Sequence, residues 1–435
     1  MKIGFVSLPV AGHLNPMTAL ARRLQSRGHE VVFIGVPDVE PFARAAGLDF
    51  VSYCEEEFPA GSIAERYRPV SKLRGLEVTR WSVRENSGDI FRAASAHLPQ
   101  KLAETGVEAL VIDTIHSFLQ LVPMSLGMPF ALVWNILNID LSGVTPPCFF
   151  SWPHETTPEA LARNAEGVKT ALEFFGPVIQ PAMEYAENVG LSIDWNDPAA
   201  TTSKLAVITQ TPKEFDFPGI PWPAQFHYAG PMHDGEGRRR IPFPWDKLTS
   251  KRFIYASLGT LVNGMEYVYK TILQAVGKLP DIQVALSVGK NVHLESVGPI
   301  PSNVIIVQTA PQLDLLKRAA LCITHAGLNT VLESLGQGVP MVAIPIGYDQ
   351  PGVAARIAYH GAGEFVEVED LTVDRLHGLI QKVLDEPAYR TKAHYFRKVI
   401  TQSRGLDIAA DVLERAFEEN QAADPSRKQA ETLQA

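Results

Sequence analysis

The chain has few cysteines and no excess of positive charge, and both absences narrow what it can be. Its 435 residues include only Cys54, Cys148 and Cys322, an odd number without paired spacing. This pattern argues against a disulfide framework and against a zinc site, and it fits a reducing, cytoplasmic compartment. A net charge of −9 argues against a nucleic-acid partner, because phosphate backbones require concentrated Lys and Arg.

Common nucleotide-binding and targeting patterns are also missing. No G-x-G-x-x-G and no G-x-x-x-x-G-K-[ST] loop is present, which argues against a nicotinamide or ATP site. The N-terminal segment has a short apolar run without a small-residue cleavage site, so it is typical of a core strand. Residues 117–139 carry no charge, but Pro123 and Pro129 interrupt them. We therefore expect a buried helix, a turn and a buried strand there, and no membrane span.

What is present is a regular alternation of apolar strands and amphipathic helices. The length suits two domains of about 200 residues each, and 46% of the residues are hydrophobic. Strands with continuous apolar character are typical of parallel sheets that helices cover on both faces. Strands are expected at residues 2–8, 30–35, 109–113, 130–134 and 205–209, and then at 252–256, 283–288, 304–308, 321–324 and 341–344. This predicts an α/β protein with two doubly wound domains.

The domain boundaries follow from breaks in this rhythm. Residues 212–250 are crowded with Pro, Gly and charge and are interpreted as the connection between domains. We predict an N-terminal domain at 1–233 and a C-terminal domain at 234–395. Residues 396–420 are predicted to form a helix that packs back on the N-terminal domain, and the polar residues 421–435 to form a disordered tail.

In the first domain, polar residues stand at the carboxyl ends of two strands, where open α/β sheets bind ligands. His13 follows the first strand in a predicted strand-to-helix loop, with Pro16 in the first helical turn. A neutral imidazole there could remove a proton from a hydroxyl group, or it could only pack against the turn. Asp113 ends another strand and could orient an imidazole or cap a helix. His116 is the alternative base.

In the second domain, two loops could hold a nucleotide. Residues 257–260 follow a strand directly, and their backbone N–H groups could bind a pyrophosphate, although this signal is weak alone. His325, Asn329, Thr330 and Glu333 follow a later strand and open a helix predicted at about 329–336. Thr330 and Glu333 could simply form a capping box. That explanation does not require His325, or Asp349 and Gln350 after the next strand, and together they indicate a nucleotide-sugar site.

Several segments resemble the UDP-glycosyltransferase superfamily, glycosyltransferase family 1, which has the GT-B fold. The matching pieces are APQ at 310–312, THAGLNTVLES at 324–334, GVPMVAIP at 338–345 and DQ at 349–350. The N-terminal GHLNPMTALARRL is similar to the catalytic-histidine loop of the family. The resemblance covers nearly the whole chain and is nearest to bacterial macrolide and zeaxanthin glycosyltransferases. It implies two Rossmann-like domains that face each other across a cleft.

The resemblance also implies what individual residues do. His13 would be the general base of an inverting sugar transfer, and Asp113 its partner. Glu333 would hold the ribose hydroxyls, and Asp349 and Gln350 would bind hydroxyls of the sugar, with Gln350 inclining the donor towards UDP-glucose. The remaining donor-binding positions would lie near the diphosphate or the uracil: Ser257, Thr260, Ala310, Gln312, His325, Gly327, Asn329 and Thr330.

Two features qualify the resemblance. Plant relatives carry a Trp immediately before the APQ, where its ring stacks on uracil, whereas this chain has Thr309. The family usually has an aromatic residue inside the H-x-G-x-N motif, and this chain has Leu328 at that position. No D-x-D motif is present, so we expect no metal and no cofactor beyond the UDP-sugar itself.

The acceptor is expected to be a hydrophobic small molecule, such as a terpenoid, carotenoid, polyketide or flavonoid. The first domain supplies aromatic residues that could line its pocket or belong to the core: Phe58, Trp81, Phe91, Phe118, Trp134, Phe149 and Phe150. Two other classes of protein remain possible from the sequence. One is a UDP-sugar epimerase of similar fold, and the other is a catalytically silent partner protein.

Overall fold

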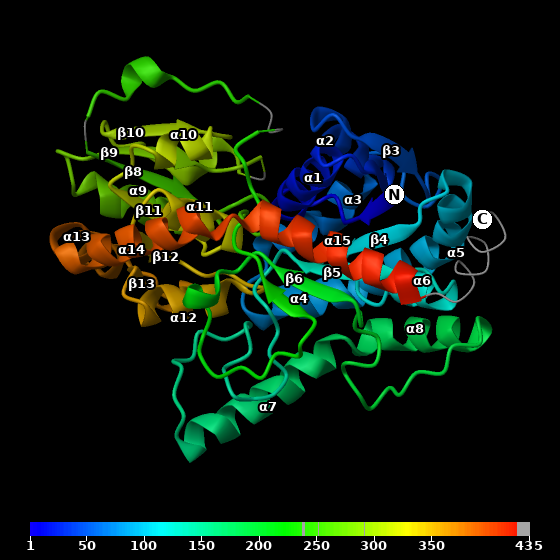
Figure 1. The fold of residues 1–435 in the computed structure, drawn as a ribbon. Coiled ribbons are helices and arrows are strands. Elements are labelled where there is room, and N and C mark those ends of the chain that lie inside the picture. Colours follow the sequence, from blue (N-terminus) through cyan, green and yellow to red (C-terminus); the bar gives the residue numbers. More distant parts are fainter. Residues whose placement is uncertain (237–239, 251, 291, 424–435) are drawn as a thin grey trace.

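The computed structural model shows two α/β domains side by side, each built on one parallel sheet (Figure 1). It describes the chain from residue 1 to 423 except residues 237–239, 251 and 291. The predicted tail lies outside the described residues from 424 onward, and its first three positions belong to a helix. The strands are β1 Lys2–Val6, β2 Glu30–Gly35, β3 Asp49–Ser52, β4 Ala109–Asp113, β5 Phe130–Trp134, β6 Ala206–Thr209, β7 Phe226–Tyr228, β8 Phe253–Ser257, β9 Gln283–Ser287, β10 Val304–Val307, β11 Leu321–Thr324, β12 Met341–Ala343 and β13 Gly363–Phe365.

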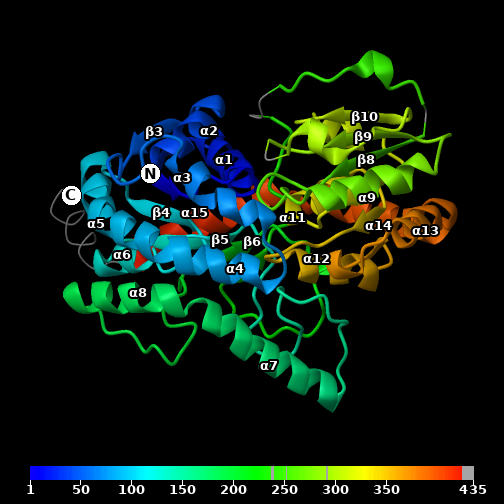
Figure 2. The ribbon, with the colours of Figure 1, turned by 180° about the vertical axis from the view of Figure 1, so that it is seen from behind.

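Helices connect the strands and cover both sheets (Figure 2). They are α1 Ala11–Ser26, α2 Glu40–Ala45, α3 Ser62–Tyr67, α4 Leu76–Ser82, α5 Gly88–Thr105, α6 Leu121–Ser125, α7 Pro158–Phe174, α8 Gly176–Asn188, α9 Glu266–Gly277, α10 Gln312–Leu316, α11 Leu328–Gly336, α12 Gln350–Tyr359, α13 Val373–Asp385, α14 Pro387–Ser403 and α15 Gly405–Ala423. Short helical turns are η1 Pro37–Val39, η2 Arg68–Lys72, η3 Val83–Ser87, η4 Lys213–Phe215, η5 Trp245–Lys247, η6 Leu294–Val297 and η7 Val368–Asp370. Within the described part of the chain, no helix combines the length and apolar character that crossing a bilayer requires.

In both sheets, the chain first adds strands on one side of the first strand and then adds the remaining strands on its other side. The N-terminal sheet has the order β3-β2-β1-β4-β5-β6-β7, and the C-terminal sheet has the order β10-β9-β8-β11-β12-β13. The chain therefore winds one way from β1 and the other way from β4, and it does the same around β8 and β11. Such a reversal opens a crevice at the carboxyl ends of the two strands, which is where doubly wound folds bind ligands.

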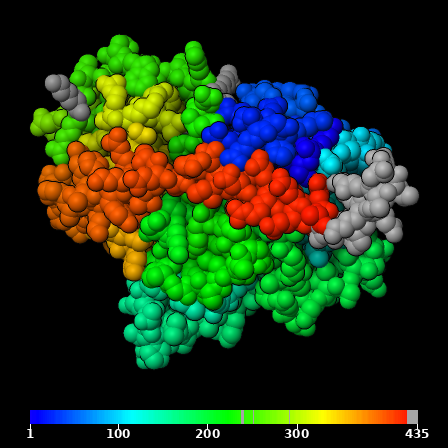
Figure 3. Space-filling model, viewed as in Figure 1, coloured from blue at the N-terminus to red at the C-terminus, as the bar shows by residue number. Residues whose placement is uncertain are grey.

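The two domains share packed surfaces. Val70 and Val78, from the segment before α5, belong to the hydrophobic core on one face of the C-terminal sheet. Leu137 and Phe149 belong to the core on its other face. The helix α15 follows the C-terminal domain in the chain but packs on the N-terminal domain. Its apolar residues join the core around β1. In the space-filling view α14 and α15 form one ridge across both domains (Figure 3).

The chain crosses between the domains at two places that touch each other. A Cβ on Gly230 would lie 2.7 Å from Oγ of Ser403, and a Cβ on Gly405 would lie 2.3 Å from the carbonyl oxygen of Pro231. Arg404, between α14 and α15, has a left-handed backbone with φ of 50°. Glycine at 230 and 405 is therefore what allows the two crossing segments to pack directly against each other.

Several elements differ from the sequence-based expectation. The helix α1 begins at Ala11, so His13 lies in its first turn and the predicted loop ends earlier. The segment 212–250 contains the strand β7, and the C-terminal helix predicted at 396–420 is interrupted at Arg404. The boundary predicted at 395/396 falls inside α14 because that helix continues to Ser403 without a break. The edge strands β3 and β13 were not predicted.

Candidate functional site

The residues predicted in the first domain meet at the reversal point of its sheet. His13 lies just after β1, and Asp113 is the last residue of β4, which pairs with β1. Nδ1 of His13 and Oδ2 of Asp113 are 2.9 Å apart. Both side chains are buried. The parallel pairing of these two strands is what brings together two residues that the sequence separates widely.

Asp113 is held by more than the imidazole. The Ser7 hydroxyl donates to the same oxygen, Oδ2, at 2.7 Å, and the Ile115 backbone N–H donates to Oδ1 at 3.2 Å. Burial raises the pKa of Asp113, but the neighbouring His13 and these hydrogen bonds outweigh burial, so that the net pKa is lowered. Burial likewise lowers the pKa of His13, and the charge and hydrogen bond of Asp113 outweigh it, so that the net pKa is raised. The pair therefore favours a charged carboxylate that orients the imidazole.

His116, the alternative base, has a different environment. Its Nε2 lies 3.5 Å from the Tyr53 hydroxyl, and the side chain is buried. Burial lowers the pKa of His116 to about 4, although the Asp113 charge acts in the opposite direction. Asp113 therefore forms its imidazole hydrogen bond with His13, and its second oxygen bonds to the backbone.

The reversal point of the second sheet carries His325 and Ser257. His325 directly follows β11, and Ser257 ends the neighbouring strand β8. The His325 imidazole lies between two glycines. A Cβ on either Gly259 or Gly327 would come within 2.5 Å of its Nε2. Burial lowers the pKa of His325 to about 4, although a hydrogen bond with the Ser257 backbone acts in the opposite direction. The ring is therefore neutral at neutral pH.

Glu333 belongs to a buried polar network and not to a helix cap. The helix α11 begins at Leu328 and its N-cap, Gly327, makes no side-chain hydrogen bond. Thr330 is thus already inside the helix, and the capping-box interpretation of Thr330 and Glu333 is wrong. Instead, Nε2 of Gln312 donates to Oε2 of Glu333 at 2.7 Å and to the Thr330 hydroxyl at 3.3 Å.

This network also fixes Gln312, at the start of α10. The Tyr255 hydroxyl donates to Oε1 of Gln312 at 3.1 Å. Ala310, two residues earlier, is partly buried, and Thr309 is exposed. The sequence-predicted donor residues at the ends of β8, β10 and β11 are therefore brought to one edge of the C-terminal sheet.

Asn329 connects this edge to the other domain. Its Nδ2 donates to the backbone carbonyl of Gly12, next to His13. Nε2 of Gln210 donates to Oδ1 of Asn329 at 2.9 Å and to the backbone carbonyl of Asn135 at 2.8 Å. The start of α11 therefore faces the start of α1 across the domain interface.

Asp349 and Gln350 stand at the beginning of α12. Oδ2 of Asp349 accepts from the backbone N–H of Leu137, in the N-terminal domain, at 2.8 Å. Oε1 of Gln350 accepts from the backbone N–H groups of Ile346 and Gly347 at 2.8 and 3.1 Å. Burial raises the pKa of Asp349, and His13 partly opposes the shift, so the two side chains lie within electrostatic reach of each other.

The loop after β8 gives Ser257 and Thr260 different environments. The Ser257 hydroxyl accepts from the Gly259 backbone N–H at 3.3 Å, whereas the Thr260 side chain is exposed. Gly259 has φ of 76°, which favours glycine over residues with a Cβ. The loop continues to α9, which begins only at Glu266, so a helix N-terminus does not follow it directly.

The aromatic residues of the first domain divide into two groups. Phe58, Phe91 and Phe149 are buried and belong to hydrophobic cores. Four others are only partly buried: Trp81, Phe118, Trp134 and Phe150. Phe118, in the segment after Asp113, has a left-handed backbone with φ of 63° and packs against Trp195 with ring centroids 5.9 Å apart.

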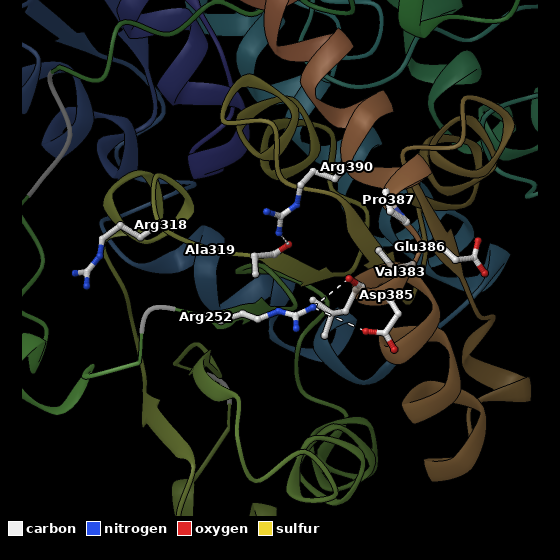
Figure 4. A pocket seen from close by; sticks show the side chains of 10 residues that line it. Arg252, Arg318, Ala319, Val383, Asp385, Glu386, Pro387 and Arg390 are labelled. Atoms are coloured by element: carbon white, nitrogen blue, oxygen red, sulfur yellow. Dashed lines mark hydrogen bonds and ion pairs between the residues drawn. The ribbon is translucent and has the colours of Figure 1, made fainter.

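A pocket of about 450 Å³ lies elsewhere, at the amino ends of β8 and β11 (Figure 4). Its arginines are engaged with the chain itself, since Arg252 donates to the Leu384 carbonyl and Arg390 to the Ala320 carbonyl. Because doubly wound sheets bind ligands at the carboxyl ends of their strands, this pocket lies at the opposite end of the strands from the candidate site.

A cluster that the sequence did not indicate lies near the end of β3. Donor atoms of Cys54, Glu57 and His97 are within 4.8 Å of one another, which is compatible with metal binding. Glu57 is exposed and His97 is partly buried, and the two side chains hydrogen-bond to each other at 2.7 Å. Burial raises the pKa of the Cys54 thiol to about 12, which disfavours the thiolate that a metal requires.

Comparison with known proteins agrees with this geometry. The sequence model of the family described as "UDP-glucoronosyl and UDP-glucosyl transferase" matches residues 247–403. A zeaxanthin glucosyltransferase of Pantoea ananas is 26% identical over 95% of each chain. An NDP-glycosyltransferase of Bacillus licheniformis is 31% identical over 95% of this chain and 96% of its own. The crystal structure of the glycotransferase of kitacinnamycin superposes with a TM-score of 0.71 at 23% identity, covering 95% of this chain and 98% of the other.

Proposed function

Because the chain belongs to the UDP-glycosyltransferase family and has its GT-B fold, we propose that this glycosyltransferase moves a sugar from a UDP-sugar to a hydroxyl of a lipophilic small molecule, with inversion at the anomeric carbon. The observation that carries this proposal is the buried pair of His13 and Asp113, which faces the donor edge of the second domain. An orienting carboxylate on one imidazole nitrogen leaves the other nitrogen for an acceptor hydroxyl.

In the proposed reaction, Nε2 of His13 removes the proton from the acceptor hydroxyl. The resulting oxygen attacks the anomeric carbon from the face opposite the leaving UDP, so an α-linked donor gives a β-glycoside. The C–O bond to the diphosphate breaks, and UDP carries away the bonding electrons. The charged Asp113 stabilises the imidazolium that forms.

The donor is proposed to bind along the edge formed by β8, β10 and β11. The diphosphate would be met by His325, by Asn329 and Thr330, and by backbone N–H groups near Ser257, Thr260 and Gly327. A neutral His325 suits this position because a ring N–H in this desolvated setting forms a strong hydrogen bond with an oxyanion. Glu333 would accept from the ribose hydroxyls, and Ala310 and Gln312 would lie near the base.

The sugar is proposed to lie against the start of α12, where Asp349 and Gln350 would bind its hydroxyls. Glucose is the sugar we propose, and no metal would be required, since the diphosphate charge is met by protein groups. The exposed Thr309 leaves uracil without an aromatic ring at that position, so we expect weaker discrimination between UDP and dTDP donors than a stacking Trp would give.

The acceptor is proposed to be an apolar natural product, in keeping with the zeaxanthin glucosyltransferase among the relatives. Its proposed contacts are the partly buried aromatic residues Trp81 in α4, Trp134 at the end of β5, Phe118 after β4 and Phe150 after β5. The test is a screen of hydroxylated carotenoids, polyketides and flavonoids against UDP-glucose, UDP-galactose and dTDP-glucose, with products detected by mass. A mass gain of one hexose supports the proposal. Conversion of UDP-glucose without any acceptor would favour an epimerase, and no turnover with any pair would favour a silent partner protein.

A further inference from the structure

One face of α12 bonds to the N-terminal domain at every turn. Asp349 accepts from the Leu137 backbone N–H. The Gly352 backbone N–H donates to the Cys148 carbonyl at 2.8 Å. Arg356 donates to Asp216, and His360 bonds to the Phe215 carbonyl at 3.1 Å. These four positions are spaced by three or four residues, so they lie on one side of the helix. A helix that belongs to the C-terminal domain is thereby attached to the other domain along its length.

The strongest of these contacts is a buried ion pair. Nε and Nη2 of Arg356 donate to Oδ1 of Asp216 at 3.0 and 2.7 Å, and both side chains are almost fully buried. The guanidinium also lies 4.0 Å from the Phe217 ring centroid. Oδ2 of Asp216 accepts from the Tyr228 hydroxyl at 2.8 Å. The carboxylate is thus saturated by partners from two domains.

The close approach of α12 depends on a glycine. A Cβ on Gly352 would lie 2.6 Å from both Cα and the carbonyl oxygen of Cys148. The helix backbone therefore rests directly on the 137–153 loop, and a sideways shift of α12 would break the ion pair at 356 and the hydrogen bond at 349 together.

We propose that Arg356 is a positioning residue for sugar transfer: through its ion pair with Asp216 it fixes the start of α12, with Asp349 and Gln350, opposite the His13–Asp113 pair. This inference rests on the proposed function, since it assigns the donor sugar to the start of α12. A buried ion pair is a weak source of net stability but can select one geometry over others. UDP itself binds β8, β10 and β11, so its affinity should not depend on Arg356.

The test compares binding of UDP and of UDP-glucose by calorimetry in the full-length protein, followed by kinetics with an acceptor from the screen. Arg356→Met should weaken UDP-glucose binding or lower kcat so that kcat/KM for the donor falls by roughly 10- to 100-fold, because a displacement of about 1 Å can cost about 10²-fold in rate. The Kd for UDP should stay within about twofold of wild type. Arg356→Lys should be intermediate, because an ammonium keeps the charge but cannot place two nitrogens against Oδ1 of Asp216.

A double variant separates positioning from stability. Asp216→Asn with Arg356→Met removes both charges, which avoids leaving one of them buried alone, and should fold while retaining the donor defect. Arg27→Met is a matched control, because Arg27 makes several ion pairs between α1 and α15 away from the cleft; it should keep wild-type donor kinetics.

Two outcomes would overturn the inference, and a third would overturn its premise. Wild-type donor kinetics in the folded double variant would show that the ion pair serves stability alone. An equal loss of affinity for UDP and UDP-glucose would show that the nucleotide site itself is disturbed. A wild-type protein that binds neither ligand would instead refute the proposed function, whatever the variants do.

Discussion

Nδ1 of His13 lies 2.9 Å from Oδ2 of Asp113, although 100 positions separate the two residues in the chain. The contact exists because β1 and β4 are neighbours at the reversal point of the sheet. Ser7, directly after β1, donates its hydroxyl to the same carboxylate oxygen, so two segments near His13 hold the Asp113 carboxylate.

His13→Ala should lower kcat by roughly 10²–10⁴, the usual scale for loss of a general base, without changing the affinity for UDP. Steady-state kinetics and calorimetry measure the two quantities. His116→Gln is the matched control, because His116 is also a buried imidazole near Asp113, and it should retain most of the activity. Unchanged kcat in His13→Ala would rule out His13 as the base.

The pH dependence should report the His13–Asp113 interaction. As the proposed base, His13 must be neutral to accept a proton. Its folded pKa is raised above 6.5, so kcat should increase with pH through a pKa above that value. In Asp113→Asn, His13 stays buried but loses the nearby negative charge. The rise of kcat with pH should therefore move to lower pH. If the pH dependence of kcat is the same in this variant as in wild type, His13 is not the group that titrates.

The same shift has a consequence for stability. Because folding raises the pKa of His13, this group stabilises the folded state below pH 6.5, and that contribution is lost as pH rises through the folded pKa. His325 has the opposite sign: its folded pKa of about 4 means that its contribution is complete above pH 6.5 and decreases as pH falls towards 4. Urea unfolding of His13→Ala and His325→Ala across pH 4 to 8 should therefore show opposite pH trends relative to wild type.

Gly259→Ala should weaken UDP binding, because the added Cβ would come within 2.5 Å of the His325 imidazole. Displacing this ring should raise the Kd for UDP by about tenfold or more, equivalent to about 1.4 kcal/mol. Gly190→Ala is the matched control: Gly190 also has a positive φ, but its added Cβ meets nothing within 4 Å. Similar losses of UDP affinity in both variants would point to backbone strain alone.

Metal chelation should leave sugar transfer unchanged. We expect equal turnover with EDTA and with added Mg²⁺, because the diphosphate charge is proposed to be met by protein groups. If EDTA lowers activity, the cluster of Cys54, Glu57 and His97 is the first place to examine among the described residues. Repeating the measurement with Cys54→Ser would then show whether that cluster is responsible.

The sequence predicts much of the site because the site depends on strand order. Apolar runs identify the strands that carry His13, Asp113 and His325, and parallel α/β sheets place such residues at one edge. The boundaries were less accurate. The prediction placed His13 in a loop because Pro16 suggested a later helix start, whereas α1 begins at Ala11, five residues before Pro16, and has Pro16 inside it.

Other features depend on contacts between distant segments, which periodicity does not reveal. The strand β7 has three residues among prolines and exists because it pairs with β6. Arg356 looks in the sequence like an ordinary polar position on a helix, and only the folded chain supplies its partner Asp216. Gln210 joins the site for the same reason, through Asn329 in the other domain.

The placement of α15 sets an order for how the molecule is made. Its residues Leu406, Ala409, Leu413 and Phe417 complete the core around β1, yet a ribosome synthesises them some four hundred residues after that strand. The N-terminal domain begins first and is finished last, so its unfilled groove must persist while the whole second domain is translated. A nascent chain of this protein would therefore depend on protection from aggregation until its final helix emerges.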